Sequence, residues 1–152
     1  MSGTTSTLDQ RLRLAHTASI AVVVLGIVFI VVGIIAWIAV SMKLRAEGIT
    51  VSDDAAFLQG WPVAGPLTAY AQADIINTHA LAISDGQTYA QLAQDDPRRA
   101  VVMNASFLRA SLFTSVISFG IALFAVGVGV VSVLLGWVGS TLTKARGVAA
   151  AA

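Results

Sequence analysis

The sequence predicts an all-α membrane protein: a hairpin of two transmembrane helices with a small, mostly helical extracytoplasmic cap between them. Of its 152 residues, 57% are hydrophobic and only 11% are charged, whereas a soluble domain carries roughly a quarter charged residues. Two apolar segments, about 18–42 and 110–140, account for this composition. Each is longer than the roughly 20 residues that an α-helix needs to cross a bilayer. The connection between them, 43–109, is too long for a structureless loop and is expected to fold.

The first apolar segment is predicted to be an uncleaved signal-anchor. Arg11 and Arg13 precede it, as they would in a cleaved signal peptide, which is the alternative. The apolar core of a signal peptide, however, has about 7–15 residues and is followed by small residues at a cleavage site. This segment is longer and ends in "VSMKLR". We therefore expect residues 18–42 to stay in the membrane.

The first half of the cap is expected to contain short helices separated by turns. The first helix should continue past the membrane to a glycine C-cap at Gly48, followed by an extended "ITV". Ser52 is placed to cap a brief helix, "DDAAFL", and "GWPVAGP" is turn material. Pro66 suits the first position of a helix over "PLTAYAQADIINTHALAI".

The second half of the cap is predicted to lead directly into the second transmembrane helix. "SDGQ" should end the preceding helix, and Thr88 is placed to cap a short helix, "YAQLA". The pair Asp95–Asp96 precedes Pro97, which is typical of a helix start with acids at its positive end. One helix is therefore expected from Pro97 to about residue 138.

Both tails are expected in the cytoplasm and the cap outside. Lysine and arginine near helix ends favour the cytoplasm. The tails, 1–17 and 141–152, contain four of them and the cap contains five, so the count alone does not decide the orientation. Arg11 and Arg13, directly before the first apolar segment, favour cytoplasmic tails. The predicted location is the plasma membrane, with two spans and both termini cytoplasmic.

Small residues follow one face of the second apolar segment at steps of four and three. A 3.5-residue repeat keeps one helix face toward a partner, and small side chains let two backbones approach closely in lipid. Isolated small pairs arise by chance, but nine consecutive positions favour a packing surface. The positions are Ser111, Ser115, Ser118, Ala122, Ala125, Gly129, Ser132, Gly136 and Gly139. The bulky residues expected to face elsewhere are Leu112, Phe113, Val116, Leu123, Val130 and Leu134.

The first apolar segment offers a shorter matching set. Ser19, Gly26 and Gly33 are also seven residues apart. The simplest prediction is that the two segments pack against each other within one chain. The small-residue stripe on the second segment is longer than this packing needs. A helix of another membrane protein, or of a second copy in a homo-oligomer, is therefore expected to share it.

Few residues carry chemistry. Neither apolar segment has an ionisable side chain, which argues against a carrier or pump acting alone. There are no cysteines, and the two histidines, His16 and His79, fall on opposite sides of the bilayer in the predicted topology. The acid pairs at 53–54 and 95–96 are interpreted as acids at helix starts. No metal, cofactor or catalytic residue is therefore expected, and a net charge of +1 argues against nucleic-acid binding.

Aromatic side chains suggest an alternative site. Trp37 and Trp137 lie near segment ends, as interfacial anchors do. In the cap, the aromatic residues and the single histidine are candidates for contacts with a ligand or a partner. These residues are Trp61, Tyr70, His79 and Tyr89.

Four stretches resemble a family of small two-helix membrane proteins common in actinobacteria and of unassigned role. They are "EGITVSDDAAFLQG", "GPLTAYAQADIINTHAL", "GQTYAQL" and "MNASFLRASLFTSV", the last being the most specific, and the resemblance covers roughly residues 30–135. Members often carry the name aromatic ring-opening dioxygenase. Such enzymes hold iron with two histidines and a carboxylate, whereas this cap has one histidine, so the residues do not support that activity. The resemblance implies a bacterial plasma-membrane protein with its cap outside.

The sequence leads us to expect a non-enzymatic integral membrane protein that acts as an accessory, assembly or structural subunit. Its partners would be the lipid bilayer and another membrane protein or a second copy of itself. The alternative is an extracytoplasmic module that binds or senses a small ligand or an envelope lipid.

Overall fold

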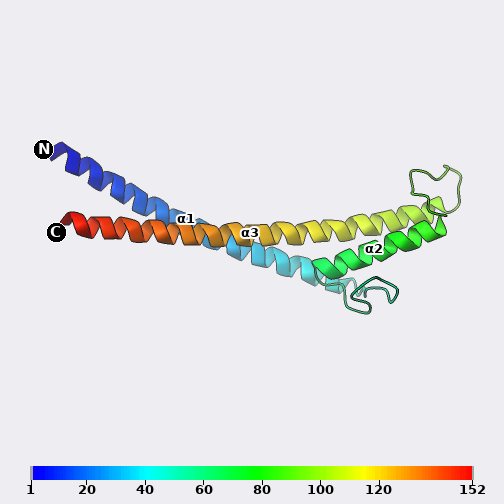
Figure 1. Ribbon diagram of the computed structural model, residues 1–152. Helices are drawn as coiled ribbons and strands as arrows, with labels where there is room; N and C mark the ends of the chain where they lie inside the picture. Colours follow the sequence, from blue (N-terminus) through cyan, green and yellow to red (C-terminus); the bar gives the residue numbers. More distant parts are fainter. Residues whose placement is uncertain (1, 152) are drawn as a thin grey trace. The chain divides into compact units, whose positions relative to one another are not determined.

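The structure contains three α-helices joined by two irregular connections (Figure 1). It is a computed structural model, described over residues 2–151, with side-chain environments for residue 7 and residues 10–144. The helices are α1 (Ser2–Ala46), α2 (Pro66–Ile83) and α3 (Arg99–Ala151). Within the described residues there is no strand, only an isolated antiparallel bridge between Thr50 and Pro62. The prediction of an all-helical chain with two long apolar helices is confirmed.

Two stretches of α1 and α3 are long and apolar enough to cross a membrane. They are Gln10–Ala46, with a mean hydropathy of 3.1, and Arg99–Lys144, with 2.5. Only 11% and 17% of the residues in their most apolar windows are buried. The core helix of a soluble protein is mostly buried, so these helices do not resemble one.

The chain divides into two compact units. One, which we call the hairpin unit, consists of Met1–Ile35 and Ala122–Ala152. The other, the core unit, consists of Ala36–Ile121. Each unit therefore contains part of α1 and part of α3, and α2 belongs to the core unit.

The tails predicted at 1–17 and 141–152 are helical over most of their length. Helix α1 already begins at Ser2, and α3 continues to Ala151. Neither stretch contains a proline. Extending an existing helix adds one hydrogen bond for each residue fixed, so growth past the apolar segments costs far less than starting a new helix.

The two short helices predicted in the cap do not form. Val51 instead pairs across its loop, accepting a hydrogen bond from Gly60 N at 2.9 Å and donating one to Trp61 O at 2.8 Å. Ser52 Oγ donates to Asp54 at 2.6 Å and does not cap a helix. Near Thr88 there is a single turn, in which Leu92 N donates to Thr88 O at 3.2 Å. Segments this short cannot offset the cost of helix nucleation.

Helix α2 and the first loop fold as a small apolar core with α1 and α3. The buried side chains include Val51 and Val63 from the loop and Leu112 and Phe119 from α3. Trp37 packs edge-on against Phe119, with 4.7 Å between ring centroids. The bounds predicted for α2, Pro66 to Ile83, agree with those observed. Gly48 has a φ of +64°, which suits a glycine just after the end of α1.

Candidate functional site

Two glycines face each other where α1 and α3 meet in the hairpin unit. A Cβ added to Gly26 would lie 2.6 Å from the backbone oxygen of Gly129, and a Cβ added to Gly129 would lie 2.6 Å from that of Gly26. Real Cβ atoms do not approach a backbone oxygen so closely. The two backbones are therefore in direct contact, and neither position accepts a side chain unless the helices move apart.

The same contact repeats every seven residues along both helices. A Cβ on Gly33 would meet the backbone oxygen of Ala122 at 2.7 Å, and one on Gly136 would meet that of Ser19 at 2.6 Å. We call this row of contacts the glycine seam. Close backbone approach through small residues is the main way in which apolar helices associate in lipid, where burial of apolar surface gives no driving force.

Only part of the predicted small-residue stripe lies in the glycine seam. Ala122, Gly129 and Gly136 are buried in it. The other half of the seam on α3 is formed by Val126 and Val133, which contact the positions of Gly33 and Gly26 and were not predicted. The stripe residues on the flank of the seam, Ala125 and Ser132, are half-buried, and Gly139 faces Ser19 near one end of the seam.

The prediction for the bulky residues is wrong at one position. Leu112 is 5% exposed and belongs to the apolar core of the core unit. Phe113 and Val116 are partly buried against the same core. Leu123, Val130 and Leu134 are exposed. The prediction treated one face of the helix as the packing surface along its whole length. In the core unit, α2 and the first loop also pack against α3.

The serine hydroxyls along α3 bond to their own helix. Ser132 Oγ donates to Val128 O at 2.8 Å, Ser118 Oγ to Thr114 O at 2.8 Å, and Ser115 Oγ to Ser111 O at 3.2 Å. These hydrogen bonds satisfy the donor while leaving lone pairs on each oxygen. None of these three donors therefore needs a partner from another helix.

The core unit contains a cavity of about 540 Å³, partly open to the outside and lined mostly by apolar surface. All three helices contribute to it. Its polar residues are Lys43, Glu47, Gln72, Ser111, Thr114, Ser115 and Ser118, and its aliphatic residues include Val40, Leu44, Ile49, Ile76, Leu108 and Leu112. Ser111, Ser115 and Ser118 of the predicted stripe thus face this cavity. Its volume is within the range of about 300–1,000 Å³ that is typical of small-molecule sites.

The cap residues predicted as ligand contacts do not line this cavity. Tyr70 contacts Phe113 edge-on at 5.9 Å, and Tyr89 lies under the guanidinium of Arg99, which is 4.1 Å from the ring centroid. His79 bonds to Asp54. Trp61 is 61% exposed. None of the four lines the cavity.

A polar contact between two side chains joins the first loop of the core unit to α2. His79 Nε2 lies 2.6 Å from Asp54 Oδ2, a pair that joins α2 to the first loop. The hydrogen bond from Ser52 and the contact with His79 both lower the pKa of Asp54. No sequence signal predicted this pair, because the two residues are 25 positions apart.

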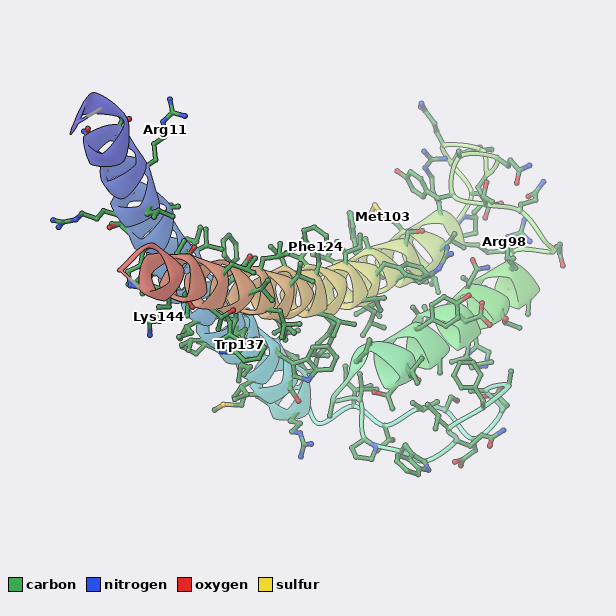
Figure 2. The ribbon with its side chains drawn as sticks, turned by 60° about the vertical axis from the view of Figure 1, so that its left-hand side comes forward. Arg11, Arg98, Met103, Phe124, Trp137 and Lys144 are labelled. Atoms are coloured by element: carbon green, nitrogen blue, oxygen red, sulfur yellow. The ribbon has the colours of Figure 1, made fainter. Side chains whose placement is uncertain are left out.

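Arg98, which is labelled in Figure 2, holds the start of α3. Its backbone N–H donates to Asp96 Oδ1 at 2.8 Å, and its guanidinium bonds both Asp96 and Asp85. The hydrogen bonds from Arg98 lower the pKa of Asp96. Because Asp96 receives the Arg98 backbone N–H, it acts as a cap, and α3 begins at Arg99, two residues after the predicted Pro97.

Within the described part of the chain, no three histidine, aspartate or glutamate residues are grouped so as to hold a metal ion. The Nε of Arg109 is buried without a hydrogen-bond partner there. Its guanidinium lies 5.9 Å from the ring of Phe113, within the range of a cation–π contact.

Comparison with known proteins gives no match: no family model, no curated protein and no solved structure is similar to this chain.

Proposed function

We propose that this chain is a non-enzymatic integral membrane protein that crosses the bilayer twice and acts as an accessory, assembly or structural subunit. The observation that supports this most is the reversed packing of the hairpin unit. Its seam buries glycine and alanine, whereas its large apolar side chains point outward. Ile35 is 60% exposed, Leu123 62%, and Phe124, labelled in Figure 2, 72%. Such a surface is stable when it is covered by hydrocarbon.

The polar groups of the hairpin unit are compatible with this environment. A lipid-facing helix must satisfy its polar groups internally. Ser132 donates to Val128 O, and Thr17 donates to Arg13 O at 3.0 Å, both within their own helix. Between His16 and Lys43, α1 carries no ionisable side chain.

The flank of the glycine seam supports a partner helix. After α1 has occupied the seam, Ala125 and Ser132 remain only half-buried on α3. Small residues at helical spacing on a lipid-exposed face let another helix approach closely. We propose that a helix of another membrane protein, or of a second copy, packs on this flank.

The proposed topology places the core unit outside and both termini in the cytoplasm. The chain has no cysteine, so single cysteines can be labelled without background. Ala93→Cys, in the second loop, should react with a membrane-impermeant maleimide on intact cells. Gln10→Cys should react only after permeabilisation. The reverse labelling pattern would show that the core unit lies in the cytoplasm. Labelling of both cysteines on intact cells would contradict membrane insertion.

The subunit role is tested by purification of the tagged full-length chain in mild detergent. The wild type should retain a partner, or a second copy, in a fixed ratio. The double variant Ala125→Leu/Ser132→Leu should lose it, because leucine fills the flank. Gly127→Leu is the matched control, since a Cβ on Gly127 meets no atom within 4 Å. A monomeric wild type at all protein concentrations would contradict the proposal.

A second candidate function is ligand binding by the core unit, and the cavity is the observation that favours it. In that case its contacts are the residues of α1, α2 and α3 that line the cavity, in place of the four cap residues predicted from the sequence.

A further inference from the structure

The cavity of the core unit combines an aliphatic wall with two opposite charges at its edge. Lys43 and Glu47 both line it and both are exposed. They are four positions apart, Lys43 in the last turn of α1 and Glu47 just after its end. Yet among the ion pairs of the described residues, neither Lys43 nor Glu47 takes part. A cation and a carboxylate that face one cavity without neutralising each other match a ligand that carries both signs of charge.

The polar atoms of the cavity narrow the chemistry of that ligand. Gln72 Oε1 accepts a hydrogen bond from Ser52 N at 3.0 Å, so the amide N–H groups of Gln72 remain as donors. With the Lys43 ammonium they can bind an anionic oxygen. The hydroxyls of Ser115 and Ser118 already donate to their own helix, so toward the cavity they offer acceptor lone pairs. The Glu47 carboxylate, the only acidic group among the lining residues, favours a ligand that donates N–H groups.

The position of these charges along α1 fits the surface of a bilayer. Lys43 is the first ionisable residue after the apolar stretch that follows His16. In the proposed topology it lies at the level of the outer headgroups, where lysine stems lie along apolar surface and the ammonium reaches water. Ala39 and Val40, which line the cavity one turn before Lys43, then lie where an acyl chain would enter.

From these observations we propose that the cavity holds one molecule of a phospholipid with a primary-ammonium headgroup, such as phosphatidylethanolamine. Lys43 and Gln72 bind its phosphate, Glu47 binds its ammonium, and part of one acyl chain fills the aliphatic wall. This inference rests on the proposed membrane insertion of the chain. The cavity is smaller than a whole two-chain lipid and partly open, which leaves the remaining acyl carbons to the bilayer.

The test is native mass spectrometry of the full-length chain in detergent, titrated separately with dioleoyl phosphatidylethanolamine, phosphatidylcholine and phosphatidylglycerol. The wild type should retain one phosphatidylethanolamine, about tenfold more tightly than the other two, because charge-assisted hydrogen bonds are about twice as strong as neutral ones. Phosphatidylcholine shares the phosphate but has no N–H donor. Equal retention of all three lipids by the wild type would overturn the proposal.

Two variants separate the roles of the charges. Glu47→Gln should abolish the preference for ethanolamine over choline while leaving phospholipid binding in place. Lys43→Gln should weaken binding of all three lipids by about tenfold. Both side chains are exposed, so neither change should unfold the core unit. Arg45→Gln, a charge on the same helix that does not line the cavity, is the control. A preference that Glu47→Gln leaves unchanged would contradict the assigned contacts.

The failure of this inference can be distinguished from the failure of the proposed function. Carbonate extraction of the same membranes reports insertion independently of lipid preference. A chain that resists extraction but shows no headgroup preference overturns only the lipid site. A chain that carbonate releases overturns the membrane proposal and, with it, this inference.

Discussion

The hairpin unit and the core unit use the same two helices but bury opposite kinds of residue. In the hairpin unit the buried positions are Gly26, Gly33, Ala122, Gly129 and Gly136, and the large apolar side chains are outside. In the core unit the buried side chains include Phe119, Leu112, Val51 and Val63. Seven of the eight acidic residues of the chain also belong to the core unit.

This difference is the one that the proposed membrane insertion predicts. In water, burial of large apolar side chains is the main driving force of folding, so they are found inside. Between helices in lipid that force is absent, and close backbone contact takes its place. A single helix, α3, changes from one pattern to the other between Phe119 and Ala122.

The largest effect is expected from Phe119→Ala in the core unit. Phe119 is 1% exposed and packs on Trp37. Removal of a fully buried phenylalanine side chain lowers the free energy of unfolding by about 3–5 kcal/mol. Thermal unfolding in detergent, followed by near-UV circular dichroism, measures this loss. The control is Phe107→Ala, in the same unit but 65% exposed, which should change stability little. Equal losses for the two variants would remove the distinction between inside and outside in this unit.

In the hairpin unit the corresponding change is an increase in size. Gly129→Leu should separate α1 from α3 because the new Cβ would lie 2.6 Å from a backbone oxygen that cannot rotate away. We expect a loss of about 1–3 kcal/mol. Disulfide trapping between Ser19→Cys and Gly139→Cys, introduced together, measures the approach of the helices, because a Cβ on Gly139 would lie 3.4 Å from that of Ser19. Trapping should slow in the variant. Gly127→Leu, whose Cβ meets open space, should leave trapping unchanged.

A smaller effect is expected where α1 meets the first loop. Ser41 Oγ donates to Ala64 O at 2.6 Å. Ser41→Ala should lower the stability of the core unit by about 1 kcal/mol, because one hydrogen bond is lost and a carbonyl loses its partner. Hydrogen exchange of the loop amides, such as that of Val63, should become faster, whereas amides of the hairpin unit should not change. Faster exchange throughout the chain would show that the two units unfold together.

The smallest effect is a dependence of stability on acid. The pKa of Asp54 is lowered in the folded chain by Ser52 and then by His79, so folding favours the ionised carboxylate. The resulting stabilisation is complete above the ordinary pKa near 3.8 and is lost as the pH falls through the lowered value. Asp54→Asn should flatten the pH dependence of unfolding in this acid range, and Ser52→Ala should flatten it in part. An unchanged slope in Asp54→Asn would show that the contact is not formed in solution.

Much of the fold was predictable because it depends on local patterns. Length and apolarity predicted α1 and α3, and Pro66 together with the alanine-rich stretch after it predicted α2. Gly26 and Gly129 each belong to a set of small residues that repeats every seven positions. These repeats also indicated small-residue surfaces on both helices. These signals are contained within one or two turns of a helix, so a single sequence reveals them.

The remaining features depend on contacts between distant residues. The cavity brings Lys43, Gln72 and Ser115 together from three helices, and no spacing in the chain connects them. The pairing of His79 with Asp54 depends on the path of the first loop. That path was not predicted, because a helix over "DDAAFL" was expected there. Val126 and Val133 were missed because the stripe was traced through small residues alone. In the structure these two valines contact the positions of Gly33 and Gly26.

The glycine seam has a further property: its contacts have a period of seven on both helices. If α1 moved along α3 by one period, Gly33 would face Gly129 and Gly26 would face Gly136, with the same absence of side chains at each crossing. Such a step displaces one helix by about 10 Å along its axis. The hydrogen bond between His16 and Thr143, at 3.3 Å, has no counterpart one period away. The glycine contacts of the hairpin unit are therefore compatible with more than one register of α1 against α3. The hydrogen bond between His16 and Thr143 forms in only one of these registers.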